Sequence, residues 1–242
     1  MKIAIQQANF IPWYAYFHMM SKVDKFFIFD NVILGDRSFV NRNFIYVNKK
    51  KKWLTLSIRK EYKRKQLKEI EIIPDNISKI KKFLLASYPK IEKGNFSEKI
   101  FDRIFDNESL KLVDLNVLIL RKICKLFNIE CEILKTSEFE PKYNLSSSEY
   151  LKKLMLRSKC TEYFNFQKGI DLGLPPYHDR FFFEENKIKL IKQNVKKIID
   201  TKEDIFLTES IIKLIISLSD TEGSMKSEFE KYSHYISYER VF

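Results

Sequence analysis

The first thirty residues constrain the fold more than any other part of the sequence. Two short apolar segments, residues 2–7 and 25–29, flank an aromatic stretch from Trp13 to Val23 that predicts a helix. Pro12 stands just before this stretch, where its fixed φ suits a turn or a first helical turn. A strand, a helix and a second strand within this length indicate a right-handed βαβ unit with parallel strands. We therefore expect an α/β fold.

The rest of the sequence predicts further strands and a set of helices. Residues 39–47 and 52–58 indicate a hairpin, and residues 232–242 show no clear periodicity. Ser146 and Glu149 have the spacing of a capping box, which should start a helix ending near Ser158. Other strands are expected at 66–73, 131–134, 161–166 and 187–192, and other helices at 76–88, 97–105, 109–127 and 208–218. We predict one compact α/β domain over residues 1–242, in which a mixed sheet opens with the βαβ unit and is covered by helices from the middle of the chain.

The chain carries a large positive charge. Its 242 residues include 44 Lys and Arg against 32 Asp and Glu, which gives a formal net charge of +12. Such a surface favours anionic partners: nucleic acid, anionic lipid, a sugar nucleotide or an acidic carrier protein. The charge alone does not choose among them. The densest run, Lys49 to Lys52, lies between two predicted strands and is interpreted as a solvated hairpin turn.

Cysteine and histidine are sparse. Cys124, Cys131 and Cys160 have no paired spacing, which excludes a Cys-x-x-Cys motif and favours a reducing cytosol. We see neither a signal peptide nor an apolar run of about 18 residues, so we expect a cytoplasmic protein without a membrane span. Three scattered histidines give no evident metal site, and the phosphate-loop and hydrolase signatures are absent.

Carboxamide side chains follow the first predicted strand. Gln6, Gln7 and Asn9 can each donate and accept hydrogen bonds, so they suit sugar hydroxyls or an amide. The alternative is that they cap the turn at Pro12 and bind the backbone. Both interpretations remain open from the sequence.

A second polar group follows the next predicted strand. Asp30 ends that strand at the edge where α/β sheets bind ligands, so it is a candidate general base or partner of a bound cation. The alternative is an ion pair with Arg37 or Arg42. In an extended segment Asn41 and Asn43 share one face, where they suit a polar ligand, while Arg42 on the other face suits a phosphate or carboxylate.

The longest irregular stretch, residues 164–185, is too long for a simple connector and is expected to have a role of its own. His178 lies in it and is a candidate general base, because histidine titrates near neutral pH unaided. The alternative is an exposed loop histidine. Trp13, Tyr16 and Tyr177 carry rings that can stack on sugars or bases, although most aromatic residues should belong to the core.

Three ordered blocks resemble the WbqC-like family, whose members are encoded in bacterial O-antigen and other surface-polysaccharide clusters. Residues 5–17, 24–30 and 41–45 are similar to the family patterns Ile-His-Gln-Pro-x-Tyr-Leu-Pro-Trp-x-Gly-Tyr-Phe, Asp-x-Phe-Val-x-x-Asp and Asn-Arg-Asn-x-Ile. Looser similarity extends over most of the chain. The family often has His where Gln6 stands and Pro where Ala8 stands, so a histidine base at the first of these positions would be lost here.

The resemblance implies an acyl or aminoacyl (glycyl-type) transferase. It would modify the amino group of an amino sugar or sugar nucleotide in the biosynthesis of surface polysaccharide, such as the O-antigen of lipopolysaccharide. No bound cofactor is expected. The activated donor would be a carrier-protein thioester, a coenzyme A thioester or an aminoacyl-tRNA, so the partner would be an acidic acyl carrier protein or, as nucleic acid, only a tRNA.

Under this interpretation Asp30 or His178 deprotonates the amine. The residues expected to contact the substrate are Gln6, Gln7, Asn9, Trp13, Tyr16, Asn41, Arg42, Asn43 and Tyr177. The alternative function is a non-catalytic basic protein that binds nucleic acid or a partner in glycan assembly.

Overall fold

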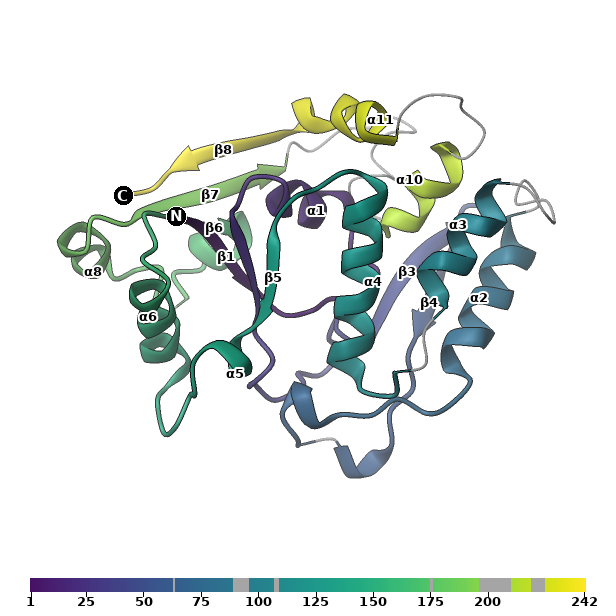
Figure 1. Cartoon of the computed structure of the whole chain (residues 1–242), viewed down its shortest axis with the longest axis horizontal. Helices are drawn as coiled ribbons and strands as arrows, with labels where there is room; N and C mark the ends of the chain where they lie inside the picture. The colour runs from purple at the N-terminus through teal and green to yellow at the C-terminus, as the bar shows by residue number, and fades with distance from the viewer. Residues whose placement is uncertain (63, 89–95, 107–108, 175, 196–209, 219–224) are drawn as a thin grey trace.

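The computed structural model is built around a six-stranded sheet (Figure 1). Its parallel strands are β1 (Lys2–Gln6), β2 (Lys25–Ile28), β5 (Glu132–Lys135), β6 (Glu162–Phe166) and β7 (Lys189–Val195), and β8 (Ile236–Arg240) pairs antiparallel with β7. A two-stranded hairpin, β3 (Arg42–Val47) and β4 (Lys50–Thr55), forms a separate sheet. The structure describes residues 1–62, 64–88, 96–106, 109–174, 176–195, 210–218 and 225–242.

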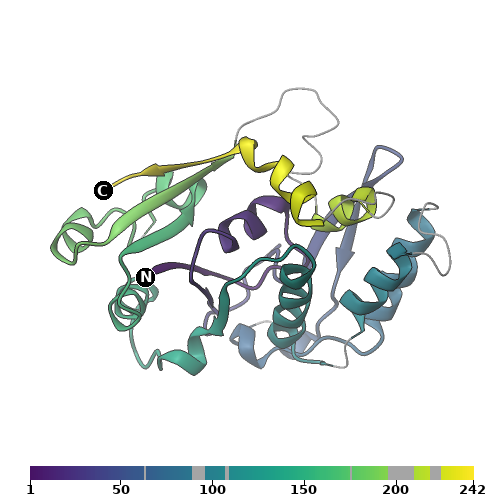
Figure 2. The same cartoon turned by 45° about the horizontal axis from the view of Figure 1, so that its top comes forward.

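Helices cover both faces of the six-stranded sheet. One hydrophobic cluster joins Ala4 of β1 to α1 (Tyr14–Met20), α2 (Asn76–Ser87), α3 (Phe96–Phe105), α4 (Leu112–Leu126) and α10 (Ile211–Leu218). A second cluster joins Ile3 and Ile5 to α6 (Ser147–Arg157) and α8 (Arg180–Glu185). Successive side chains of a strand point to opposite faces, so β1 is buried on both sides. Figure 2 shows α10 and α11 (Met225–Lys231) on the side of the molecule where α1 lies.

No helix in the described part of the chain is long and apolar enough to cross a lipid bilayer.

The order of the strands reverses next to β1. The six strands lie in the order β5-β2-β1-β6-β7-β8, so the chain runs outward from β1 through β2 to β5. It then returns through α6 to the other side of β1 and forms β6 and β7. In open α/β sheets, ligands bind at the carboxyl ends of the strands where such a reversal occurs. The carboxyl ends of β1 and β6 are therefore the first place to look for a site.

Most sequence predictions that depend on local patterns are confirmed. β1 and β2 pair in parallel around α1, as expected of a βαβ unit. The Ser146 side chain accepts a hydrogen bond from Glu149 N, and the Glu149 side chain caps the Ser146 N–H, so the capping box is present. The predicted helix at 208–218 is described only from Ser210, and its earlier residues lie outside the described part of the chain.

Several predictions differ from the structure. Residues 164–185, expected to be irregular, contain α7 (Gln167–Asp171) and α8. The strand expected at 66–73 is wrong, because Gln66 and Glu69 form a capping box that starts a 3₁₀ turn, η2 (Leu67–Glu69). β8 forms in residues 232–242, where no element was predicted. It pairs with β7 at the edge of the sheet, and its alternation is short: Ile236 is buried and Tyr238 half-buried, each followed by an exposed polar residue.

A buried histidine joins α1 to β8. His18 is 3% exposed, and its Nδ1 lies 2.9 Å from the hydroxyl of Tyr238. The two rings stack with their centroids 5.7 Å apart. Burial, assisted by the positive charge of Lys22, lowers the pKa of His18 from 6.5 to about 4. The folded protein therefore holds this imidazole neutral.

This pKa predicts a loss of stability in acid. Between about pH 6.5 and pH 4 only the unfolded chain binds a proton at His18, so the free energy of unfolding should fall as the pH falls through this window, by up to about 3 kcal/mol. Urea unfolding at a series of pH values measures the slope. His18→Gln should flatten it, whereas His234→Gln at an exposed position should not; equal slopes in both variants would refute the assignment.

Candidate active site

Two side-chain amides connect the strands at the reversal. Gln6 ends β1, and its Nε2 donates a 2.7 Å hydrogen bond to Oδ1 of Asn165 near the end of β6. The same Oδ1 accepts a 2.7 Å hydrogen bond from Phe166 N. The Asn165 amide nitrogen lies 3.4 Å from the hydroxyl of Tyr163. Asn165 is buried, so its hydrogen bond fixes the Gln6 amide at the carboxyl ends of β1 and β6.

A hollow of about 450 Å³ lies next to Phe166, between the start of α1, α7 (Gln167–Asp171) and the ends of β6 and β7. Its lining is formed by Trp13, Phe166, Gln167, Lys168, Asp171, Leu172, Gln193 and Val195. The walls are mostly apolar and a few polar groups converge on them, which is the usual composition of a small-molecule site. We refer to it as the β6–β7 hollow.

Gln193 is the buried polar residue of the β6–β7 hollow. Its Nε2 donates to Ala15 O at 3.0 Å and to the hydroxyl of Tyr238 at 2.9 Å. Its Oε1 is buried and accepts no hydrogen bond from any described residue. An unpartnered buried acceptor costs roughly 1–3 kcal/mol. The wall of the hollow therefore contains an amide whose hydrogen-bonding capacity is unfilled.

Charged side chains lie on the rim of the β6–β7 hollow. Asp171 and Lys168 are exposed residues of α7. Oδ1 of Asp171 lies 3.3 Å from Nζ of Lys192, and Nζ of Lys192 also lies 3.2 Å from Oε2 of Glu239. These two carboxylates raise the pKa of Lys192, which therefore stays charged. Of these groups Asp171 and Lys168 line the hollow, so its rim offers one carboxylate, which is ion-paired with Lys192, and one cation.

A strained turn orients Trp13 toward the β6–β7 hollow. Ile11 has a φ of +43°, which is costly for a β-branched residue. Asn43 Nδ2 donates to Phe10 O at 3.2 Å and to Ile11 O at 2.6 Å, and Ser210 Oγ also donates to Ile11 O at 2.9 Å. Asn43 is buried, so these bonds are shielded from water. They maintain the turn in spite of its strain.

The segment before this turn is held as firmly. Asn116 of α4 donates through Nδ2 to Ala8 O at 2.7 Å and to Val40 O at 2.8 Å. The hydroxyl of Tyr16 donates to Gln7 O at 2.8 Å. Tyr16 is fully buried, which raises its pKa well above the ordinary value, so its ring lies inside the core. Its hydroxyl fixes the backbone from which the Gln7 and Asn9 side chains extend.

Asp30 has a different environment from the one expected. It is fully buried at the end of β2, and its Oδ1 accepts 3.0 Å hydrogen bonds from Thr136 Oγ1 and Ser137 N. Its Oδ2 accepts a 2.5 Å hydrogen bond from Ser137 Oγ. These donors belong to α5 (Thr136–Phe139) rather than to Arg37 or Arg42. The carboxylate therefore fastens the start of α5 to β2.

The Asn41-Arg42-Asn43 segment separates into two faces, as its extended conformation predicts. Asn43 points inward, and Asn41 Nδ2 donates to Leu56 O at 3.2 Å. The Arg42 guanidinium lies 4.4 Å from the ring centroid of Trp53, and its Nη2 donates to Arg37 O at 3.1 Å. The two amides thus hold backbone, whereas Arg42 is half-buried beside an aromatic ring.

Tyr177 and His178 lie on the other face of the sheet. The Tyr177 ring stacks on Tyr163, with centroids 6.0 Å apart, and packs against the cluster that includes α6 and α8. His178 is exposed, and the adjacent Asp179 pairs with Lys152. Trp13 and Phe166 pack against the opposite cluster. The structure therefore connects Gln6 to Tyr177 through Asn165, places Trp13 in the lining of the β6–β7 hollow, and separates Asp30 and His178 from that hollow.

Sequence reasoning missed three residues of this arrangement. Asn165 is an amide inside an otherwise aromatic strand, which is a usable signal for a buried polar role. Gln193 follows directly after the predicted strand 187–192, so the sequence pattern did not place it in the sheet. Asp171 lies in the long irregular stretch that was expected to have a role. No three His, Cys, Asp or Glu side chains come together as a metal site within the described residues.

Comparison with known proteins covers most of the chain. The sequence profile of the WbqC-like protein family matches residues 7–216. The chain is 26% identical over 197 residues to the uncharacterized protein Rv1507c of Mycobacterium tuberculosis, an alignment that spans 78% of this chain and 80% of that protein. No solved structure matches the chain. The family match includes the strained turn and every residue that lines the β6–β7 hollow.

The hydrogen bonds of Asn43 predict a large effect on stability. Asn43→Ala leaves two carbonyls beside the strained turn without this donor, and we expect the free energy of unfolding to fall by about 2–4 kcal/mol. Asn41→Ala is the matched control, because Asn41 makes one 3.2 Å bond from a half-buried position and should cost about 1 kcal/mol or less. Urea unfolding followed by circular dichroism compares them, and equal losses would contradict this account of the turn.

Proposed function

This chain belongs to the WbqC-like protein family, and we propose that it transfers an acyl or aminoacyl group to the amino group of an amino sugar or sugar nucleotide in surface-polysaccharide synthesis. One observation carries the proposal. The β6–β7 hollow, at the carboxyl edge of the sheet beside the reversal in strand order, combines apolar walls with a rim carboxylate. Its size suits one sugar or a short acyl group.

The reaction needs alignment and one proton acceptor. The amine nitrogen forms a bond to the carbonyl carbon of the activated acyl group. The bond from that carbon to the sulfur or oxygen of the donor breaks, and the proton lost by the amine ends on the departing thiol or hydroxyl. An activated donor already supplies the driving force, so holding the two reactants in register contributes most of the rate.

We assign the role of general base to Asp171. Its exposed side chain lies on the rim of the β6–β7 hollow, where an acceptor amine can approach it directly or through one water molecule. Asp30 suits this role less well, because its carboxylate is buried and already accepts hydrogen bonds from Thr136 and Ser137. His178 is exposed on the other face and is the second candidate for the base.

The remaining groups would position the substrates. Trp13 and Phe166 offer apolar ring surface on which a sugar can lie. Lys168 lines the hollow and would attract the phosphates of a nucleotide-linked acceptor. The Gln193 amide lies in the wall, where a small shift would let its Oε1 accept a hydrogen bond from the acceptor.

The role of Asp171 predicts the activity of a conservative variant. Asp171→Asn keeps the shape of the side chain but removes the base, so kcat for transfer should fall by about 10²–10⁴-fold. Asp102→Asn is the matched control. Asp102 lies on the distant helix α3, and this change breaks a similar surface ion pair, the one with Lys81. The amide product formed from a nucleotide-linked amino sugar and each activated donor is quantified by mass spectrometry.

One result would refute the proposed transfer, and a second would refute the role of Asp171. The unmodified protein would form no amide with a carrier-protein thioester, a coenzyme A thioester or an aminoacyl-tRNA. Alternatively, Asp171→Asn would retain the full rate, which would move the base to another residue.

A further inference from the structure

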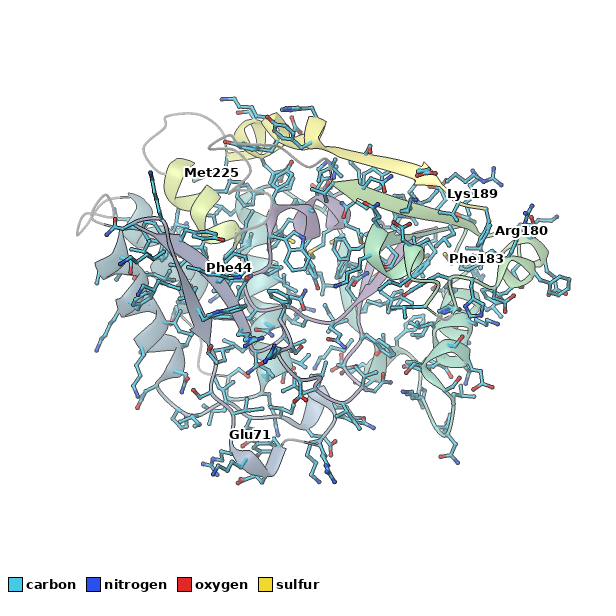
Figure 3. The ribbon with its side chains drawn as sticks, turned by 180° about the vertical axis from the view of Figure 1, so that it is seen from behind. Phe44, Glu71, Arg180, Phe183, Lys189 and Met225 are labelled. Carbon is cyan, nitrogen blue, oxygen red and sulfur yellow. The ribbon has the colours of Figure 1, made fainter. Side chains whose placement is uncertain are left out.

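The β3–β4 hairpin has one buried face and one open face. In the register of the hairpin Arg42 is opposite Thr55, Phe44 is opposite Trp53 and Tyr46 is opposite Lys51, so these six side chains share one face. The alternate residues Asn43, Ile45 and Leu54 are buried against the core. Figure 3, which views the molecule from behind, shows the hairpin with Phe44 in front of α2 and α3. The open face therefore points away from the body of the protein.

Cations lie directly over the rings of this face. The Arg42 guanidinium lies 4.4 Å from the Trp53 ring centroid. Nζ of Lys51 lies 3.8 Å from the centroid of Phe44 and 4.7 Å from that of Trp53. Trp53 nevertheless remains 45% exposed, which is unusual for so large an apolar side chain. The face therefore combines accessible ring surface with fixed positive charge.

The rings continue from the hairpin to the β6–β7 hollow. Phe44 and Trp53 are 5.5 Å apart between centroids, and Trp53 and Phe39 are 6.4 Å apart. Phe39 is 5.7 Å from Trp13, which is in turn 5.7 Å from Phe166. Trp13 and Phe166 line the hollow. We call these five residues the aromatic row.

The charge in the hairpin part of the aromatic row is of one sign. From Arg37 to Lys60 the sequence contains eight Lys and Arg residues, at 37, 42, 49, 50, 51, 52, 59 and 60, and no Asp or Glu. Lysines 49–52 were interpreted as a solvated turn. Only Asn48 and Lys49, both at positive φ, form the two-residue turn, and Lys50 to Lys52 belong to β4. The lysine run therefore extends along the hairpin beside Trp53.

We propose that the aromatic row binds an unpaired strand of RNA. Bases can stack on the rings, and the phosphates between them can pair with Arg42 and Lys51. The row has more rings than one base can cover, which favours a strand over a single nucleotide. In a duplex the faces of the bases are stacked on one another, so they cannot stack on the rings of the row. Phe39 and Trp53 are exposed and the other three rings are half-buried, and accessible rings on a basic surface are typical of single-strand binding.

The aromatic row also distinguishes among the donors of the proposed function, on which this step rests. An aminoacyl-tRNA carries its activated group at the end of an unpaired strand. If that strand lies along the row with its end at Trp13, the aminoacyl ester reaches the β6–β7 hollow. Neither thioester donor carries consecutive unpaired bases that would use the row.

Fluorescence anisotropy with a labelled unpaired RNA oligonucleotide, without donor or acceptor, tests the aromatic row. We expect Trp53→Ala to weaken binding about tenfold or more. Phe181→Ala, which removes a 74% exposed ring on α8 at a distance from the row, should leave binding unchanged. Lys51→Ala should lower the slope of log affinity against log salt by about 0.7.

Several results would overturn the proposal. The unmodified protein would fail to bind RNA, or would bind a duplex as well as a single strand, or a mononucleotide as tightly as an oligonucleotide. Trp53→Ala and Phe181→Ala would lose equal affinity. Alternatively, the protein would bind an acidic protein in place of RNA, and that binding would depend on Trp53. The transfer assay is independent of this measurement. RNA binding without transfer from any donor would refute the proposed transferase function and support RNA binding by the aromatic row. Transfer from a thioester by a protein that binds no RNA would support the transferase function and refute RNA binding by the aromatic row.

Discussion

The arrangement of the site depends on how the chain leaves β1. Ile11 has a left-handed conformation that a β-branched residue avoids, and it is maintained by hydrogen bonds from Asn43 and Ser210 to the Ile11 carbonyl. Asn116 fixes the carbonyl of Ala8 just before the turn. Because Trp13 follows within two residues of Ile11, these amides decide where its ring lies. The β6–β7 hollow and the aromatic row both include that ring.

The two proposed surfaces therefore meet at Trp13 and Phe166. The β6–β7 hollow lies beside the reversal in strand order, and its apolar walls carry the exposed carboxylate of Asp171 on the rim. The aromatic row brings positive charge and ring surface to its edge from the hairpin. A substrate could use both surfaces if one end is long, anionic and aromatic and its reactive end is small. Trp13 links recognition to chemistry in this account.

A larger hollow, of about 550 Å³, lies at the opposite edge of the sheet. His18, Phe127 and Phe229 are among its lining residues, next to the residues that lead into β2 and β5. This is the amino-terminal edge of the parallel strands, where α/β sheets do not usually bind ligands. His18 is buried and neutral there, and its hydrogen bond to Tyr238 gives it a structural role in joining α1 to β8. Size alone is therefore a poor guide to the site.

Sequence patterns predicted the features that depend on neighbouring residues. The βαβ unit, the capping box at Ser146 and the alternation of the hairpin all follow from short-range periodicity. The roles of the polar residues depend on partners that are distant in sequence. Asn43 meets the turn 32 residues before it, and Gln6 meets Asn165 159 residues after it. No local pattern could separate a carboxamide that holds backbone from one that faces a ligand.

The most direct test of the central claim is a crystal structure with a nucleotide-linked amino sugar bound. The account predicts that the sugar lies in the β6–β7 hollow, with its amine within hydrogen-bonding reach of Asp171 and its ring against Trp13 or Phe166. Electron density for the sugar at the opposite edge, beside His18 and Phe127, would contradict it.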